Sequence, residues 1–379
     1  MKRVDEIDIL IVGSLCGNDI SFYEYLSRHG MRAKVARRFD DNSLKEDNIP
    51  QLKYEYYDDN AVIKYRTRFE LIKLLQKTKL VASFSSSLGC ELSYLWVFRK
   101  LLGLPPVINM PTGSDLLEVV NENTLTGFRY RYFMKTCDLN FVTGAPGYMD
   151  SIFNNKIKNF SFYRYPYYIP EYDEIGDATF SSSRLRFFHP SHIDFKEVDN
   201  SEYRKSSKGN DRFFKAFIRA LDNGLDAECV LLSRGADVGP AREIINASKH
   251  RDRFIWKNEL SRQELVREII QSDLIIDQFD IGIMGGITVE AMALQRPVMI
   301  YLSKKTMDMV YPVPPQMLIA HSEEEIFQEL MNNSDRKKLK RIGINGRKWL
   351  LDNHGYERCL KQFLFHYSVL TGEKIPNLW

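Results

Sequence analysis

The sequence has no long hydrophobic run, few cysteines and almost no net charge. No stretch approaches the ~18 uninterrupted apolar residues of a membrane-spanning helix. The five cysteines among 379 residues are scattered without metal-ligand spacing, which indicates a reduced chain rather than a disulfide framework. A net charge of +3 argues against a nucleic-acid binder that works through bulk charge. We therefore expect a cytoplasmic protein with no nucleic-acid partner.

The beginning of the chain also lacks the features of a secretory signal. Its charged start contains acids, and its apolar run covers only Ile9 to Val12 before Gly13. This pattern predicts a first β-strand. The following loop, GSLCGND, lacks the GxGxxG spacing of dinucleotide-binding proteins, which argues against a Rossmann dehydrogenase.

Short apolar runs alternate with amphipathic segments of helical length in both halves of the chain. The first array includes DILIVG, KLVASFS, PPVINMP and LNFVTG, with a helix expected over about 90–102. A second array follows an acidic, serine-bearing stretch and includes AECVLLSRG, DLIIDQF and PVMIYLS. Such alternation is typical of parallel sheets with crossover helices. The sequence predicts an α/β chain with two doubly wound, Rossmann-like domains facing across a cleft.

The expected domains follow from this alternation. We predict a first domain over residues 1–172, a linker over 173–183 and a second domain over 184–355, with a final helix over 356–379 that crosses back to the first domain. One helix start has local support, because SRQE from Ser261 to Glu264 forms a capping-box pattern. Ligands of open α/β sheets bind beyond the carboxyl ends of the strands, so candidate site residues should lie in the loops after strands.

Two adjacent glycines, Gly285 and Gly286, precede an alanine- and methionine-rich helix. Backbone can approach a ligand closely there, and the amides at the start of the helix suit a phosphate or pyrophosphate. The alternative is a tight strand-to-helix turn without a ligand. Glu290 lies one turn into the same, otherwise apolar helix, where it either accepts bonds from ribose hydroxyls or is simply solvated.

Two cations stand near the ends of successive predicted strands. Lys208 directly precedes an amphipathic helix with Phe213, Phe214 and Phe217 on one stripe, and Arg234 follows the next strand. Both could reach a diphosphate opposite the glycine pair, although charged loop residues are often only solvated. No pair of aspartates is spaced to bind a metal, so we expect cations to take its place.

The second half of the sequence resembles the nucleotide-binding domain of bacterial GT-B glycosyltransferases, near glycosyltransferase family 4. The resemblance rests on HPSHIDF, the KG pair, VLLSRGAD, FIWKNELS, DQFDIGIMGGITVEAMAL and GINGRKWLLDNH, and covers about residues 184–365. Over the first half it rests on the fold pattern and on PTGSDL. It implies retaining, metal-independent transfer of a sugar from a nucleoside diphosphate donor, with no cofactor. The first domain would then bind the acceptor and the second the nucleotide sugar.

The resemblance also implies roles for individual residues. Lys208 and a nearby basic residue would bind the diphosphate, the glycine turn would supply backbone donors, and Glu290 would bind the ribose. Ile255, Trp256 and Lys257 would surround the base. The full set of expected donor-binding residues is Gly13, Gly17, His192, Lys208, Arg234, Ile255, Trp256, Asp277, Gly285, Gly286 and Glu290. Lys208, Glu290 and Asp115 are the expected catalytic residues.

The sequence departs from the pattern of this family at two places. Many members carry a second glutamate eight residues before the ribose-binding one, and here that position is Gly282. Relatives often have a histidine near the acceptor, whereas the only histidine before the linker is His29, which we interpret as structural. Asp115 of TGSDL could orient an acceptor hydroxyl or assist proton removal; alternatively it is the N-cap of a helix over 116–120.

The acceptor half is locally basic. Residues 61–170 contain 14 Lys and Arg against 7 Asp and Glu, with aromatics interleaved in GFRYRYFMK and FSFYRYPYY. Such a face suits anionic lipid headgroups or a lipid diphosphate acceptor, although ordinary α/β surfaces also carry one. A location at the inner face of the plasma membrane is therefore a possible refinement of the cytoplasmic prediction.

Three functions remain open on the sequence. The first is a hexosyltransferase-like enzyme that moves sugar to a glycan or lipid-linked acceptor in bacterial polysaccharide, O-antigen or capsule synthesis. The second is a non-catalytic partner subunit with the same fold, supported by Gly282. The third is a nucleotide-sugar epimerase, whose usual acid and histidine set is not evident.

Overall fold

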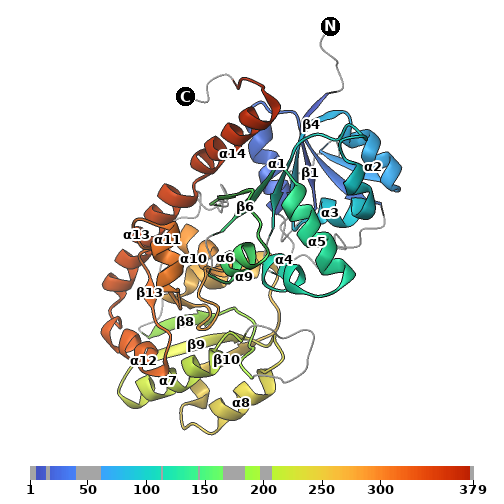
Figure 1. Ribbon diagram of the computed structural model, residues 1–379. Coiled ribbons are helices and arrows are strands. Elements are labelled where there is room, and N and C mark those ends of the chain that lie inside the picture. The colour runs from blue at the N-terminus through green and yellow to red at the C-terminus, as the bar shows by residue number, and fades with distance from the viewer. Residues whose placement is uncertain are drawn as a thin grey trace. The chain divides into compact units, whose positions relative to one another are not determined.

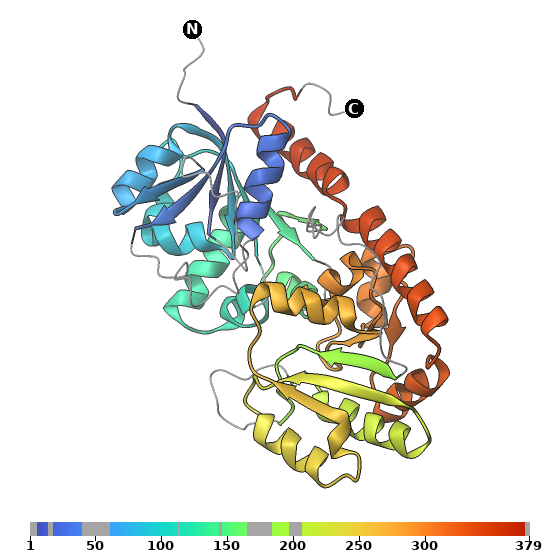
Figure 2. The same ribbon diagram turned by 180° about the vertical axis from the view of Figure 1, so that it is seen from behind.

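The computed structural model describes residues 6–13, 18–39, 61–111, 114–143, 146–164, 184–196 and 207–375 (Figures 1 and 2). The described residues form two compact units. Unit 1 combines the segments up to residue 164 with residues 354–375, and unit 2 contains residues 184–353. The predicted linker over 173–183 lies outside the described residues.

Unit 1 contains a seven-stranded parallel sheet in the order β3-β2-β1-β4-β5-β6-β7. Strands β1 and β4 are almost wholly buried, as expected for strands covered on both faces. The order reverses between β1 and β4. The strands are β1 (Ile7–Val12), β2 (Ala33–Arg38), β3 (Val62–Tyr65), β4 (Thr78–Phe84), β5 (Val107–Met110), β6 (Leu139–Val142) and β7 (Phe160–Phe162).

The helices of unit 1 include the last helix described, α14. Its Phe363 ring lies edge-on to Phe22 of α1 at 4.9 Å, and Tyr356 stacks on Tyr25 at 4.0 Å. Both views show α14 in red beside α1 in blue (Figures 1 and 2). The helices are α1 (Asn18–Arg28), α2 (Arg68–Leu75), α3 (Ser87–Leu92), α4 (Ser114–Leu117), α5 (Leu125–Thr136), α6 (Pro146–Asn154) and α14 (Tyr356–Thr371), with 3-10 turns η2 (Ser93–Phe98) and η3 (Val119–Asn121).

Unit 2 contains a six-stranded parallel sheet in the order β10-β9-β8-β11-β12-β13. Here the order reverses between β8 and β11. The strands are β8 (Leu185–His189), β9 (Ala227–Leu232), β10 (Phe254–Lys257), β11 (Leu274–Ile276), β12 (Val298–Ile300) and β13 (Leu318–Ile319). The two parallel sheets with their helices confirm the predicted α/β class.

The helices of unit 2 present apolar stripes to this sheet. On α7, Phe213, Phe214 and Phe217 are fully buried, as their spacing predicts, and burial of each such side chain contributes about 1.5–3 kcal/mol. The helices are α7 (Asn210–Asp222), α8 (Val238–Asn246), α9 (Arg262–Gln271), α10 (Gly286–Ala293), α11 (Lys304–Val310), α12 (Glu323–Asn332) and α13 (Arg336–His354), with the 3-10 turn η5 (Arg251–Arg253).

The structure confirms one predicted helix start and corrects two other local predictions. Ser261 and Glu264 form the capping box at the start of α9. The helix expected over 90–102 is instead α3 followed by η2, because Ser93 has φ = 50° and ends the α-helix. Asp115 lies inside the first turn of α4, so its prediction as the N-cap of a helix over 116–120 is wrong.

Candidate functional site

The candidate site lies at the carboxyl end of the unit 2 sheet, where the strand order reverses. The loops after β8 and β11 diverge at this point, which is where open α/β sheets bind ligands. The start of α7 and the loop after β9 join them. The predicted residues His192, Lys208, Arg234 and Asp277 all fall in or beside these loops.

Backbone hydrogen bonds fix Lys208 between the two loops. Its amide donates to the Asp194 carbonyl at 2.6 Å, and its carbonyl accepts from the Phe279 amide at 2.7 Å. Gly209 follows with φ = 64°, a left-handed conformation that favours glycine and that turns the chain into α7. The KG pair therefore places a half-buried lysine at the reversal point of the sheet.

Arg234 is held against the loop after β8. Its Nε and Nη2 atoms donate to the Pro190 carbonyl at 3.0 and 2.7 Å, and Nη1 lies 3.9 Å from a Glu259 carboxylate oxygen. Burial lowers the pKa of Arg234, against the opposing effect of Glu259. A guanidinium in such a position remains charged, and an anionic ligand would restore part of its lost solvation.

Burial and the positive charges of Lys208 and Arg234 lower the pKa of two neighbouring histidines, His189 and His192. Burial, followed by the charges of Lys208 and Arg234, lowers the pKa of the fully buried His189 to about 3. The same two cations, after burial, lower the pKa of His192, whose side chain is half exposed. His189 is therefore neutral at pH 7, and its Nε2 lies 3.0 Å from Nδ2 of Asn210. The structure thus brings His192, Lys208 and Arg234 together.

Asp277 joins three elements rather than facing outward. It is buried, Ser191 donates to its Oδ1 at 2.5 Å, and the Thr288 hydroxyl of α10 donates to its Oδ2. A Cβ atom at Gly285 would lie 3.3 Å from Oδ2. Asp277 therefore positions the glycine turn and the start of α10.

Gln278 organises the loop that follows β11. Its Nε2 donates to the Ile283 carbonyl at 2.7 Å, and its Oε1 accepts from the Ile281 and Asp280 amides at 2.7 and 3.2 Å. Gly282 within this loop has φ = 78°, and a Cβ there would lie 3.2 Å from atoms of Tyr301 and Ser303. The loop conformation thus favours glycine at this position over the glutamate found in many GT-B enzymes.

Asp280 lies two residues before Gly282 in the sequence, and other groups already hold its carboxylate. Arg212 donates to its Oδ1 at 2.5 Å, and the His321 Nε2 atom lies 3.7 Å from the same oxygen. Burial raises the pKa of Asp280, but hydrogen bonds from Ser207 and Arg212 outweigh this effect and the pKa lies below its usual value. The Asp280 carboxylate thus stabilises the start of α7 and the residues just before it through Arg212 and Ser207.

The glycine pair forms the start of α10. Gly285 is the N-cap and supplies no side-chain hydrogen bond, so the first-turn amides are not satisfied by a capping side chain. Among the described residues, a Cβ at Gly286 would meet no atom within 4 Å. Glu290 lies half-buried one turn into α10. This helix start therefore presents amides beside open space, the arrangement that anions favour.

The residues predicted around a base are partly engaged with protein groups. The guanidinium carbon of Arg242 lies 4.1 Å from the centre of the Trp256 ring. Lys257 pairs with Glu268, which also accepts from Arg186 Nη2 at 3.1 Å. Ile255 and Trp256 remain half-buried at the edge of the sheet. Lys257 therefore belongs to an internal ion-pair network.

Sequence reasoning missed the residues that join the loops after β8 and β9. Asp237 accepts from the Phe195 and Lys196 amides at 2.7 and 2.8 Å, and Asp194 accepts from the Ala236 amide at 2.8 Å. Gly235 has φ = 112°, and a Cβ there would lie 2.4 Å from the Ile193 nitrogen. The only sequence signal was the aspartate that follows each strand by a few residues.

In unit 1, the predicted residues lie near the reversal point between β1 and β4. Gly13 has φ = 83°, and a Cβ would lie 2.2 Å from Ser87 Oγ, so close packing of the two loops requires glycine there. Gly17 lies outside the described residues. Asp115 is buried, and after burial its charge contributes to raising the pKa of Cys90 and of Tyr130.

The described residues show neither a cluster of metal ligands nor a membrane-spanning helix. No group of three or more His, Cys, Asp or Glu side chains within this part of the chain could hold a metal ion. None of the helices that the structure describes is long and apolar enough to cross a membrane.

The two parallel-sheet units define the GT-B fold class. The chain is similar to HepE of Anabaena, solved in complex with UDP, at 12% identity and a TM-score of 0.65 over 96% of this chain and 100% of that one. It is also similar to a glycosyltransferase from Rickettsia africae (13%, TM-score 0.64, 98% and 100%) and to sucrose-phosphate synthase from Thermosynechococcus elongatus (12%, 0.62, 97% and 100%). At these identities the likeness shows the fold. No protein-family model matches the sequence, and no curated protein matches it.

Proposed function

We propose that this protein is a glycosyltransferase that moves a sugar from a nucleoside diphosphate donor to a glycan or lipid-linked acceptor. The observation that carries the proposal is that hydrogen bonds hold Lys208, Arg234 and the start of α10 to the loops after β8 and β11, where the order of the unit 2 sheet reverses. Two cations and a helix start beside open space suit a diphosphate. The similar structure of HepE holds UDP, which supports this ligand class.

The proposed site meets the main electrostatic need of the reaction. Cleavage of a glycosyl phosphate bond places negative charge on the leaving diphosphate, and fixed donors that meet this charge lower the barrier. Lys208, Arg234 and the α10 amides would stabilise the diphosphate without a metal, and Glu290 would accept bonds from the ribose. Because Asp277 and Gln278 fix the surrounding loops, little reorganisation is needed when the donor binds.

The acceptor side of the proposal rests on unit 1. Asp115 would orient an acceptor hydroxyl, and the basic, aromatic surface of this unit would bring the protein to an anionic membrane where lipid-linked acceptors reside. We place the reaction in bacterial polysaccharide, O-antigen or capsule synthesis, with retention at the sugar carbon. The similar glycosyltransferase structures support the transfer class.

Thermal unfolding with and without nucleoside diphosphates tests the donor site. At about 100 times Kd, a bound ligand adds about 2.7 kcal/mol of stability, so UDP or GDP should raise the Tm by several degrees. Lys208→Ala should abolish the shift. Lys215→Ala is the matched control, since this lysine lies on α7, the helix that Lys208 precedes, and pairs with Asp211. The absence of a shift with UDP, GDP or their sugars would overturn the enzyme proposal.

A second candidate is a non-catalytic subunit that keeps the fold and supports an active partner. It is favoured by Gly282, which stands where many GT-B enzymes have a glutamate. The positive φ of Gly282 is unfavourable for a glutamate at this position. Transfer assays across a panel of nucleotide sugars separate the two. Donor binding without transfer or hydrolysis supports the subunit, and interconversion of donor sugars without transfer would indicate an epimerase.

A further inference from the structure

An apolar stripe on unit 1 faces solvent. It consists of Tyr94, Val97 and Phe98 of η2 and of Leu101 just beyond it, which are 61%, 57%, 50% and 86% exposed. With three residues per turn in a 3-10 helix, Tyr94 and Val97 share one side of η2, and Phe98 and Leu101, also three residues apart, extend the exposed surface. A cluster of large apolar side chains held in water indicates an interaction surface.

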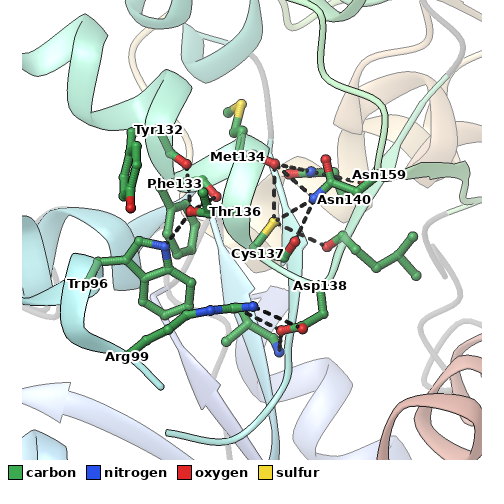
Figure 3. Close-up of polar contacts among 12 residues, drawn as sticks. Trp96, Arg99, Tyr132, Phe133, Met134, Thr136, Cys137, Asp138, Asn140 and Asn159 are labelled. Carbon is green, nitrogen blue, oxygen red and sulfur yellow. Dashed lines mark hydrogen bonds and ion pairs between the residues drawn. The ribbon is translucent and has the colours of Figure 1, made fainter. Parts of the chain in front are cut away.

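The stripe cannot turn inward, because the opposite side of the segment is already packed. Figure 3 shows the Trp96 indole directed at α5, where Nε1 donates to Thr136 Oγ1 at 2.7 Å. The Trp96 ring also meets Phe133 edge-on at 4.9 Å. Trp96 is almost fully buried, so its burial fixes which residues point outward.

Polar contacts hold the segment rigid on both sides of the stripe. Arg99 donates to both oxygens of Asp138 at 3.0 and 3.2 Å, and Asp138 also accepts from the Val107 amide (Figure 3). Gln76 donates to the Leu102 carbonyl at 2.8 Å. Ser93, with φ = 50°, redirects the chain out of α3 at a cost of about 1–3 kcal/mol. The structure therefore maintains this exposed surface.

The surroundings of the stripe are basic. Residues 91–104 contain two cations, Arg99 and Lys100, and one acid, Glu91. Lys100 is exposed between Phe98 and Leu101, and the guanidinium of Arg68 lies 5.7 Å from the centre of the Tyr94 ring. The nearby charge of Asp138 is taken up by Arg99. Exposed apolar side chains flanked by cations complement a surface that is apolar below and anionic above.

We propose that the apolar stripe docks on an anionic lipid bilayer. Val97, Phe98 and Leu101 enter the boundary between headgroups and acyl chains, Tyr94 lies at headgroup level, and Lys100 and Arg68 meet lipid phosphates. The inference deepens the proposed use of a lipid-linked acceptor and rests on that function for its role. Docking itself requires no donor and no reaction.

Sedimentation of the full chain with vesicles tests the proposal. The protein should bind vesicles containing anionic phosphatidylglycerol, bind pure phosphatidylcholine vesicles weakly, and be released by salt. Phe98→Ser/Leu101→Ser should lower the partition coefficient about tenfold or more, and Lys100→Glu about fivefold. Phe365→Ser/Val369→Ser, which removes two exposed apolar side chains from α14, is the matched control and should bind as the wild type does.

Two results would overturn the proposal. One is equal binding by wild type and the stripe variant, or no binding to anionic vesicles. The other is a wild-type dimer in solution that the stripe variant converts to a monomer, which would make the stripe a self-association surface. UDP-induced thermal shifts, measured on the same variants without vesicles, report separately on the donor site and confirm that they are folded.

Discussion

Gly235 occupies a conformation and a space that only glycine fits. Its φ of 112° is unfavourable for other residues, and an added Cβ would lie within 2.4–2.5 Å of Ile193 backbone atoms. Gly235→Ala should therefore cost several kcal/mol and separate the loops that hold Arg234 and His192. Urea unfolding and the UDP-induced thermal shift measure both effects.

Gly239 provides the matched control four residues away. It lies in α8, and no atom of the described residues would be within 4 Å of its Cβ. Gly239→Ala should raise stability by about 0.4–1 kcal/mol, because alanine has less conformational freedom in the unfolded chain. Equal effects of the two substitutions would contradict the geometry described for the loop after β9.

His189 links the stability of unit 2 to pH. Its pKa is about 3 in the folded chain, against 6.5 for an ordinary histidine, because it is buried beside Lys208 and Arg234. Only the unfolded chain takes up a proton between these values. Stability is therefore complete above pH 6.5 and is lost as the pH falls toward 3, by about 2 kcal/mol between pH 7 and pH 5.

The variant His189→Gln should remove this part of the pH dependence, since glutamine does not titrate in that range. The free energy of unfolding, measured in urea at pH 7 and pH 5, should fall by about 2 kcal/mol less in the variant. Other histidines are the same in both proteins and cancel in the comparison. Identical pH dependence would show that His189 accepts a proton in the folded state.

The sequence located cations and glycines but not their partners. Lys208, Arg234 and the glycine pair are recognisable because each follows or precedes a strand or helix in a local pattern. The roles of Gln278, Asp194 and Asp237 could not be predicted, since they depend on loops that come together only in the folded sheet. The constraint on Gly282 likewise depends on Tyr301 and Ser303, across the next strand.

At the scale of elements, helices differ in whether a side chain at the N-cap accepts hydrogen bonds from the first backbone amides. The Ser261 hydroxyl accepts from the Glu264 amide and the Glu264 carboxylate accepts from the Ser261 amide, whereas Ser303, the N-cap of α11, makes no such side-chain bond. Ser261→Ala should cost about 1 kcal/mol. Ser303→Ala should cost a few tenths of a kcal/mol at most, because no capping bond is lost. Chemical denaturation of both variants measures the difference, and equal losses would refute the capping assignment.

The sequence pattern did not predict the boundary between α3 and η2, because this boundary depends on a single unusual dihedral angle. Periodicity over 90–102 favours one helix, because apolar residues occur on every turn. The positive φ of Ser93 divides this segment into α3 and η2. The contacts of Trp96 with α5 and of Arg99 with Asp138 offset the cost of that backbone conformation. These partners lie about 40 residues further along the chain, as the separations of 40 and 39 residues show.

At the scale of the whole molecule, the α/β class was predictable because alternation of apolar runs and helical segments extends along the chain. Both sheets proved parallel and doubly wound. The order of the strands was not predictable in the same way, since periodicity does not state which strands are neighbours. The two points where the strand order reverses are known only from the structure. They show which of the candidate loops lie together at the site.

The membership of α14 in unit 1 has a consequence for biosynthesis. The contacts of Phe22 with Phe363 and of Tyr25 with Tyr356 join residues that are far apart in the order of synthesis. All of unit 2 emerges between them. Unit 2 can therefore complete its fold during synthesis, while unit 1 must wait, with the α1 contact surface unfilled, until α14 leaves the exit tunnel.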